Sequence, residues 1–176
     1  DSAEDTQLCI YEKLKIESGR LYSTPQEKMS IEFITTIHNN IFYSTFPKHS
    51  GKIRNRPIYH SKISSSPPEY IRDRLLNCCK NFEFRKNYNY NLEVEYDELE
   101  ENIEEINRFI SEVFCIHPFI DGNTRTTYLL RNYLLSHTDH AERIPYNLYK
   151  REDYVKAWEE SLEGNQNYLN ELILIE

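Results

Sequence analysis

His117-Pro118-Phe119-Ile120-Asp121-Gly122-Asn123-Thr124-Arg125 is the stretch around which this 176-residue chain is organised. It places a histidine, a carboxylate, a glycine, an amide and a guanidinium within nine residues. Residues 126–136 continue with the apolar spacing of a helix, so the stretch predicts a loop that leads into a helix N-terminus. Because the first N–H groups of a helix have no internal partners and the helix dipole favours negative charge, such a junction suits an anion.

The side chains of this stretch favour phosphate chemistry. Gly122 permits a positive φ and a close backbone approach to a ligand. Asn123 and Arg125 can donate hydrogen bonds to phosphate oxygens. Asp121 is the hard oxygen ligand that Mg²⁺ takes when it also holds substrate phosphates, and His117 can transfer a proton near neutral pH. Together they predict a site for a nucleotide phosphate, Mg²⁺ and a general base.

Length and composition limit the class of protein. A chain of 176 residues favours one domain with a substantial core, and a net charge of −8 argues against a protein that mainly coats nucleic acid. No apolar run approaches the roughly 18 residues that span a bilayer, and no signal peptide is recognisable. The four cysteines lack zinc-like spacing and favour reduced thiols. We expect a cytoplasmic protein without direct nucleic-acid or membrane binding, and secretion as an effector stays open.

Apolar periodicity predicts an all-α fold with six or seven helices and little strand. The expected helices cover residues 8–16, 25–44, 69–81, 97–114, 126–136, 152–164 and 167–174. Gly19 is expected to end the first helix, and residues 82–96 are expected to be irregular. We expect residues 1–24 to form an N-terminal helix or tail, and residues 25–176 to form the main domain.

Residues 47–63 are basic and irregular. They include Lys48, Lys52, Arg54, Arg56 and Lys62, and they contain no acidic residue. Glycine and proline in this segment break any helix, and residues 57–63 suggest a short strand or hairpin. The simpler interpretation is a basic surface loop, and the alternative is an arm that lies beside an anionic ligand.

The stretch from His117 to Arg125 resembles the signature of the Fic (filamentation induced by cAMP) family, which includes bacterial cell filamentation proteins. The family signature is His-Pro-Phe-x-(Asp/Glu)-Gly-Asn-Gly-Arg-x-x-Arg, and this chain carries the degenerate form HPFIDGNTRTTY. Other segments are similar to further parts of the family in the same order: residues 37–42 and 51–54 before its flap, 57–63 at the flap, 67–71 after it, and 154–172 at its closing helices.

The resemblance implies an all-α domain with a short β-hairpin flap beside the active-site loop. It also implies transfer of AMP from ATP to a Ser, Thr or Tyr hydroxyl of a target protein. His117 would be the base that deprotonates this hydroxyl, and Asp121 would hold Mg²⁺. The implied nucleotide-binding residues are Gly122, Asn123, Thr124 and Arg125.

The resemblance also implies how a target would dock. The flap would add a strand from an extended stretch of the target, which requires little reading of the target's sequence. The implied docking residues are Ile58, Tyr59, His60 and Ile63. The expected partners are therefore ATP and a protein substrate, and a second copy of the chain or an antitoxin is also open.

Two positions depart from the signature. Thr124 replaces a glycine, which is tolerated if the residue is helical and harmful if the loop needs a positive φ there. The related death-on-curing phosphotransferases carry Lys at this position. Tyr128 replaces the arginine that holds the γ-phosphate in many relatives. Arg131 lies one turn further along the same face; an inward position is the alternative, but we expect it to point to solvent. The alternatives to AMP transfer are therefore phosphotransfer, and a degenerate domain that binds a nucleotide or a partner without turnover.

Glu17 is a candidate inhibitory residue. Residues 13–19 resemble the family's inhibitory motif, (Ser/Thr)-x-x-x-Glu-(Gly/Asn), only around Ile16 and Glu17. In the family this glutamate pairs with the arginine that Tyr128 replaces here. The alternative is an exposed glutamate at the end of a helix.

Overall fold

The computed structural model describes residues 2–59, 65–91 and 98–137, together with positions 156, 159, 160 and 163. In these residues the regular structure is helical and contains no strand. The elements are α1 (Ala3–Tyr22), α2 (Ile31–Phe42), the short 3₁₀ helix η1 (Pro68–Tyr70), α3 (Ile71–Asn91), α4 (Glu98–Ile116) and α5 (Asn123–Ser136). No helix in this part of the chain is long and apolar enough to cross a membrane.

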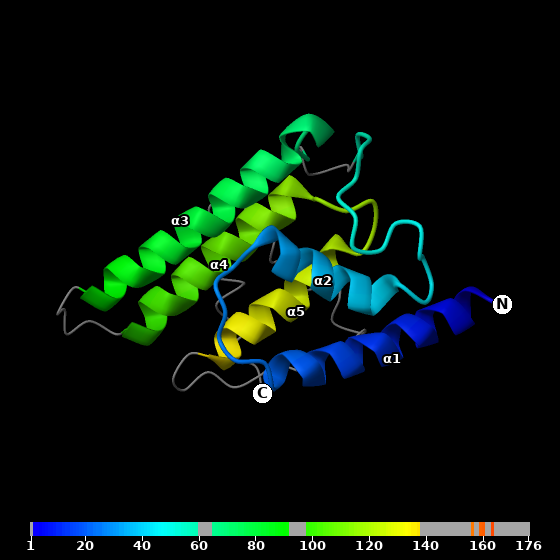
Figure 1. Cartoon of the computed structure of the whole chain (residues 1–176), viewed down its shortest axis with the longest axis horizontal. Coiled ribbons are helices and arrows are strands. Elements are labelled where there is room, and N and C mark those ends of the chain that lie inside the picture. The colour runs from blue at the N-terminus through cyan, green and yellow to red at the C-terminus, as the bar shows by residue number, and fades with distance from the viewer. Residues whose placement is uncertain are drawn as a thin grey trace.

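Helix α5 is the centre of the fold. It packs against α4 on one side and against α1 and α2 on the other, and α3 covers the outer side of α4 (Figure 1). Every residue from Arg125 to Leu135 is buried. The N-terminus of α5, which carries the predicted site, is therefore held by helices from distant parts of the sequence.

The core follows the predicted helical periodicity. Ile34, Ile37 and Ile41 are fully buried on one face of α2, and Phe109 and Val113 are fully buried on α4. Each such side chain contributes about 1.5–3 kcal/mol when it leaves water. All four cysteines lie in the described part of the chain, and none of them forms a disulfide.

Several helix boundaries differ from the predictions. Helix α1 begins early because Ser2 and Asp5 form a capping box, and it continues through Gly19, which does not end it. Helix α2 begins at Ile31 rather than near residue 25, because the Ser30 side chain accepts a hydrogen bond from the N–H of Phe33. Helix α3 continues to Asn91, so the prediction that residues 82–91 are irregular was wrong.

The predicted β-hairpin flap is not supported. Residues 57–59 form neither strand nor helix, and His60 and Ile63 lie outside the described residues. The segment before residue 57 is bonded to the loop after α4: the N–H of Arg54 donates to the carbonyl of Pro118 at 2.9 Å. The helices expected after residue 137 lie almost wholly outside the described part of the chain, and the division at residue 24 stays a prediction.

Candidate functional site

The loop formed by residues 117–122, here called the catalytic loop for the role that the sequence predicts, joins the end of α4 to the start of α5. His117 and Asp121 lie in the loop, Gly122 is the N-cap of α5, and residues 123–125 form the first turn of that helix. The predicted junction between a loop and a helix N-terminus is therefore confirmed. No side chain in the described part of the chain caps this helix end, and such an end favours negative charge.

Gly122 is required at its position for two reasons. Its φ is +79°, a conformation that side-chain-bearing residues rarely adopt. A Cβ atom at this position would lie 2.3 Å from Cε2 of Phe42. The ring of Phe42 therefore packs directly against the glycine backbone, and any side chain would collide with it.

His117 has a strained backbone and a defined ring orientation. Its φ is +53°, the only positive value for a non-glycine residue in the described ranges, and such strain clusters at functional sites. Its Nδ1 lies 3.3 Å from the carbonyl oxygen of Phe114. Because a carbonyl only accepts, Nδ1 donates the hydrogen of this bond, and in the neutral ring Nε2 carries the lone pair. This is the tautomer in which Nε2 can act as a general base.

Asn123 shapes the catalytic loop with both ends of its amide. Its Oδ1 accepts from the N–H of Phe119 at 2.9 Å, and its Nδ2 donates to the carbonyl of Phe119 at 2.8 Å. The side chain is 3% exposed. In this arrangement the amide holds the loop, and the donation to phosphate that the sequence suggested stays a prediction.

Asp121 and Arg125 lie together at the start of α5. Asp121 Oδ1 accepts from the N–H of Gly122 at 2.7 Å and from the Arg125 guanidinium at 3.3 Å. The Asp121 side chain is 67% exposed, whereas that of Arg125 is 8% exposed and lies over the ring of Phe42. The described residues contain no group of three His, Cys, Asp or Glu side chains suited to a metal ion. The exposed carboxylate of Asp121 could contribute one ligand to a Mg²⁺ ion whose other ligands were phosphates and water, and this role stays a prediction.

The two departures from the family signature have different surroundings. Thr124 lies in the first turn of α5 and has helical backbone geometry. Its position does not require a positive φ, so the β-branched side chain causes no backbone strain there. Tyr128 is 1% exposed and belongs to the core. Arg131 is fully buried, and its Nε donates to Oδ1 of Asn107 on α4 at 2.8 Å. The prediction that Arg131 points to solvent was wrong, because α4 supplies a polar partner inside the core.

His38 is a structural residue of the site that we did not predict. Its Nδ1 accepts from the N–H of Gly51 and its Nε2 lies 2.9 Å from the carbonyl of Asp121, to which it donates. The ring stacks on Phe119 with a centroid separation of 3.9 Å. Burial lowers the pKa of His38 to about 4, so the neutral ring joins two loops at neutral pH.

Arg54 is the second structural residue that we did not predict. Its guanidinium donates to the carbonyls of His117 and Ser66, each at 2.6 Å, and to that of Arg56 at 3.0 Å. It is 3% exposed, and burial lowers the pKa of the guanidinium. Because it lies among basic residues in the sequence, no local signal separates it from its solvated neighbours.

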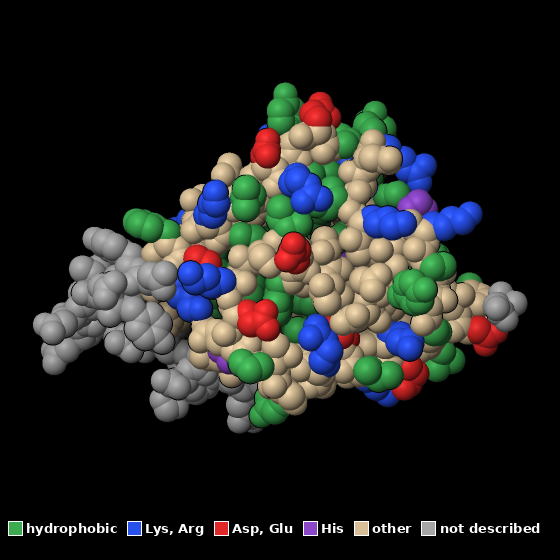
Figure 2. Space-filling model, viewed as in Figure 1, with side chains coloured by type: hydrophobic (Ala, Val, Ile, Leu, Met, Phe, Trp, Pro, Cys, Tyr) green, Lys and Arg blue, Asp and Glu red, His purple; other side chains and the backbone are tan. Residues whose placement is uncertain are grey.

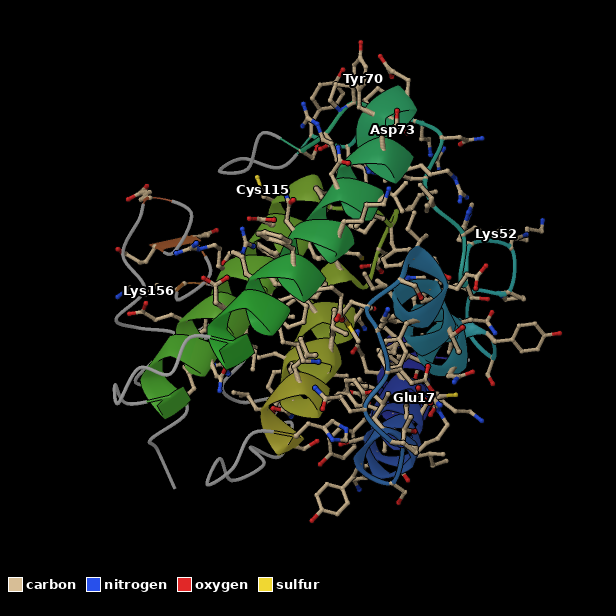
Figure 3. The ribbon with its side chains drawn as sticks, turned by 60° about the vertical axis from the view of Figure 1, so that its left-hand side comes forward. Glu17, Lys52, Tyr70, Asp73, Cys115 and Lys156 are labelled. Carbon is tan, nitrogen blue, oxygen red and sulfur yellow. The ribbon has the colours of Figure 1, made fainter. Side chains whose placement is uncertain are left out.

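Glu17 is buried, and the alternative of an exposed helix-end glutamate was wrong. Its side chain accepts from Nε of Arg20 at 3.0 Å and from Nδ2 of Asn40 at 2.9 Å. Figure 3 shows Glu17 on α1. Asn40 lies on α2, so Glu17 contributes to the contact between α1 and α2. Its inhibitory role stays a prediction.

A comparison with models of protein families identifies the family of this chain. The Fic/DOC family matches residues 28–135, which is more than half of the chain. The chain belongs to the Fic/DOC family. This result confirms the family that the stretch from His117 to Arg125 indicated.

Two curated relatives of this Fic domain are the proteins named Protein adenylyltransferase fic-1 from Caenorhabditis briggsae and Caenorhabditis elegans. They are 27% and 26% identical to the chain over 125 residues. The match covers 69% of this chain and 22% of each relative, so the chain spans about a fifth of the length of these relatives.

Solved structures show the same fold. The BepC protein of Bartonella tribocorum, with bound AMPPNP, has a TM-score of 0.77 and 15% identity, and the match covers 98% of this chain and 86% of that one. Fic-1 of C. elegans has a TM-score of 0.70 and 20% identity, with 98% of this chain and 48% of that one covered. The predicted all-α Fic domain is therefore confirmed.

Proposed function

We propose that this Fic domain transfers AMP from ATP to a Ser, Thr or Tyr hydroxyl of another protein. The observation that carries the proposal is the arrangement of the catalytic loop. His117, with its Nδ1 hydrogen directed to Phe114, lies at one end, and the start of α5, beside Asp121, lies at the other. The name protein adenylyltransferase, given to both curated relatives, supports AMP as the group transferred.

In this proposal the nucleotide phosphates bind at the start of α5. The backbone of residues 122–124 and the guanidinium of Arg125 supply positive potential, and Asn123 maintains the shape of the loop. Asp121 would hold Mg²⁺ through its exposed carboxylate. When bound, this ion would neutralise charge on the phosphates.

His117 is the proposed general base. Its Nε2 accepts the proton of the target hydroxyl as the hydroxyl oxygen bonds to the α-phosphorus of ATP. The bond from that phosphorus to the pyrophosphate group breaks, and pyrophosphate leaves. The Phe114 carbonyl, 3.3 Å from Nδ1, stabilises the imidazolium that forms. Positioning and charge neutralisation carry most of such a reaction.

The target is proposed to dock at residues 57–63, of which residues 57–59 are described. Tyr59 is 95% exposed, and the carbonyl of Ile58 accepts a hydrogen bond from Oγ of Ser65 at 2.8 Å. One side of this backbone is therefore anchored. Strand addition by the target stays part of the proposal and is independent of a preformed hairpin.

Binding without turnover is the second candidate function, and Tyr128 is the observation that favours it. At 1% exposure, Tyr128 fills a core position where many relatives place a cation for the γ-phosphate. Inhibition by Glu17 is a separate proposal, and it would require Glu17 to leave Arg20 and Asn40.

ATP labelled at either the α- or the γ-phosphate tests the reaction. The purified chain is incubated with Mg²⁺, a cell lysate and each labelled ATP, beside a His117→Ala variant. We expect protein bands labelled from α-labelled ATP alone, and no bands with the variant. Label from γ-labelled ATP alone would show phosphotransfer and contradict the proposal. ATP binding without either label would favour the second candidate.

A further inference from the structure

Positive charge is concentrated in one irregular segment of this acidic protein. Residues 47–59, here called the basic arm, contain Lys48, Lys52, Arg54 and Arg56 and no acidic residue, whereas the whole chain has a net charge of −8. Figure 2 shows Lys and Arg side chains gathered with a histidine over the loop that follows α2. The segment is therefore a local cationic surface on a protein whose overall field is negative.

Three cations of the basic arm face solvent. Lys48, Lys52 and Arg56 are exposed, whereas Arg54 is buried. No ion pair among the described residues includes any of the three exposed side chains. Lys52 donates to the backbone carbonyl of Lys48 at 3.1 Å, and in Figure 3 it points away from the helices. Their charge is thus available to a partner.

The basic arm is fixed to the catalytic loop. The N–H of Arg54 donates to the carbonyl of Pro118, and its guanidinium donates to the carbonyl of His117. Nearer to α2, the N–H of Gly51 donates to the His38 ring, which also holds the carbonyl of Asp121. The exposed cations therefore have a defined position relative to His117 and Asp121, unlike charges on a free tail.

We propose that the basic arm docks an acidic segment of the protein that receives AMP. This inference rests on the proposed function, because that function makes a protein the substrate at the adjoining loop. The exposed cations attract carboxylates over about 8 Å at physiological salt and raise the rate of encounter. The three cations are spread over nine residues of an irregular segment, as suits an extended acidic peptide.

The surroundings of the arm favour a protein over nucleic acid. Tyr59 is 95% exposed and Phe46 is 40% exposed, which adds the aromatic surface that is common in protein interfaces. A net charge of −8 opposes a nucleic-acid backbone, because such a backbone extends past the arm and meets the negative remainder of the surface. A short acidic segment contacts the arm alone. Nucleic acid is therefore an outcome that the test must exclude.

The test uses a charge-reversed arm and a matched control. The arm variant is Lys48→Glu, Lys52→Glu and Arg56→Glu in the full chain. The control variant is Lys28→Glu, Arg72→Glu and Lys80→Glu, which reverses three exposed cations outside the arm and gives the same net charge. The probes are a fluorescent peptide with a threonine flanked by Asp and Glu, its twin with Asn and Gln, and a fluorescent single-stranded DNA. Fluorescence anisotropy measures binding at about 50 and about 300 mM NaCl.

We expect the acidic peptide to bind at least about tenfold more tightly than its amide twin at low salt, and high salt to remove the difference. The arm variant should lose this preference, and the control variant should keep it. Equal binding of the two peptides, an equal loss in both variants, or tighter binding of the DNA than of the acidic peptide would overturn the proposal. ATP affinity, measured by calorimetry at about 300 mM NaCl, where the altered charges are screened, should be the same in the arm and control variants. If the chain bound the acidic peptide but labelled no protein from α-labelled ATP, the proposed function would be rejected and the acidic docking surface would still stand.

Discussion

The catalytic loop and the basic arm are both irregular and are joined by the bonds of Arg54, but the catalytic loop is in addition closed by the residues of its own motif. The catalytic loop is closed by neighbours in sequence: Asn123 bonds to both backbone groups of Phe119, and Asp121 bonds to Gly122 and Arg125. The basic arm is held from a distance. Its Arg54 bonds to His117, which lies 63 residues further along the chain.

This difference explains which of the two regions the sequence reveals. The bonds that Asn123 and Asp121 make run over four residues or fewer, so the residue types and spacing of the catalytic loop are informative. An arm that depends on distant carbonyls carries no such pattern, because a buried arginine and a solvated one look alike in sequence.

Arg54→Met should cause the largest loss of stability. The substitution removes the guanidinium that donates to the carbonyls of Ser66 and His117, and these carbonyls are then left without a donor inside the protein. It should lower the free energy of unfolding by about 3–5 kcal/mol. Arg56→Met is the matched control, because the Arg56 side chain is exposed. Urea unfolding measures both variants. Similar losses in the two would show that Arg54 is not the anchor of the arm.

Gly122→Ala should be nearly as damaging. The alanine would be strained at φ +79°, and its Cβ would collide with Phe42. We expect a loss of about 3 kcal/mol in the free energy of unfolding. Gly19→Ala on helix α1 is the control, because a Cβ atom at Gly19 would have no neighbouring atom within 4 Å. Helix propensity predicts that this control stabilises the protein by up to about 1 kcal/mol. A tolerated Gly122→Ala would contradict the described loop.

His38 should make the stability depend on acid pH. Burial lowers the pKa of His38 to about 4 from the ordinary value of 6.5, so between these values the unfolded chain binds a proton that the folded chain does not. The stabilisation is complete above about pH 6.5 and is lost as the pH falls towards about 4, by about 3 kcal/mol. Unfolding of a His38→Asn variant should lack this component, whereas His49→Asn, at an exposed site, should keep it. An unchanged pH profile in His38→Asn would exclude His38 as the source.

Asn123→Asp should have a smaller effect that is confined to the loop. The carboxylate can still accept from the N–H of Phe119, but it cannot donate to the Phe119 carbonyl. We expect a loss of about 2 kcal/mol in the free energy of unfolding. Asn55→Asp at an exposed position should change stability by less than about 0.5 kcal/mol. Equal effects of the two substitutions would mean that the Asn123 amide does not close the loop.

The helices and the loop after α4 were predictable because their signals are local. The period of Ile34, Ile37 and Ile41 gives the buried face of α2, and Gly122 marks the turn before α5. Local signals fail where a partner comes from elsewhere. Gly19 stays helical because α1 packs on α2 and α5, which overrides the weak helix propensity of glycine.

Buried polar residues show the same limit within the site. Arg131 lies inside because Asn107 of α4 meets it, and Glu17 lies inside because Arg20 and Asn40 surround it. Arg20 lies three residues from Glu17, but Asn40 and Asn107 lie on other helices, so neither burial can be read from near neighbours in sequence alone. His38 illustrates the same point, since its role requires two loops that meet only in the folded chain.

AMP transfer by a His117→Asn variant tests the proposed role of the catalytic loop most directly. Asparagine tolerates the left-handed backbone at φ +53° but has no group that can accept the hydroxyl proton at neutral pH. Transfer from α-labelled ATP should fall by at least about a hundredfold, whereas ATP affinity and the urea midpoint should stay close to those of the unmodified chain. Undiminished transfer would contradict the role of His117 as the base. Loss of folding together with transfer would show instead that His117 is a packing residue.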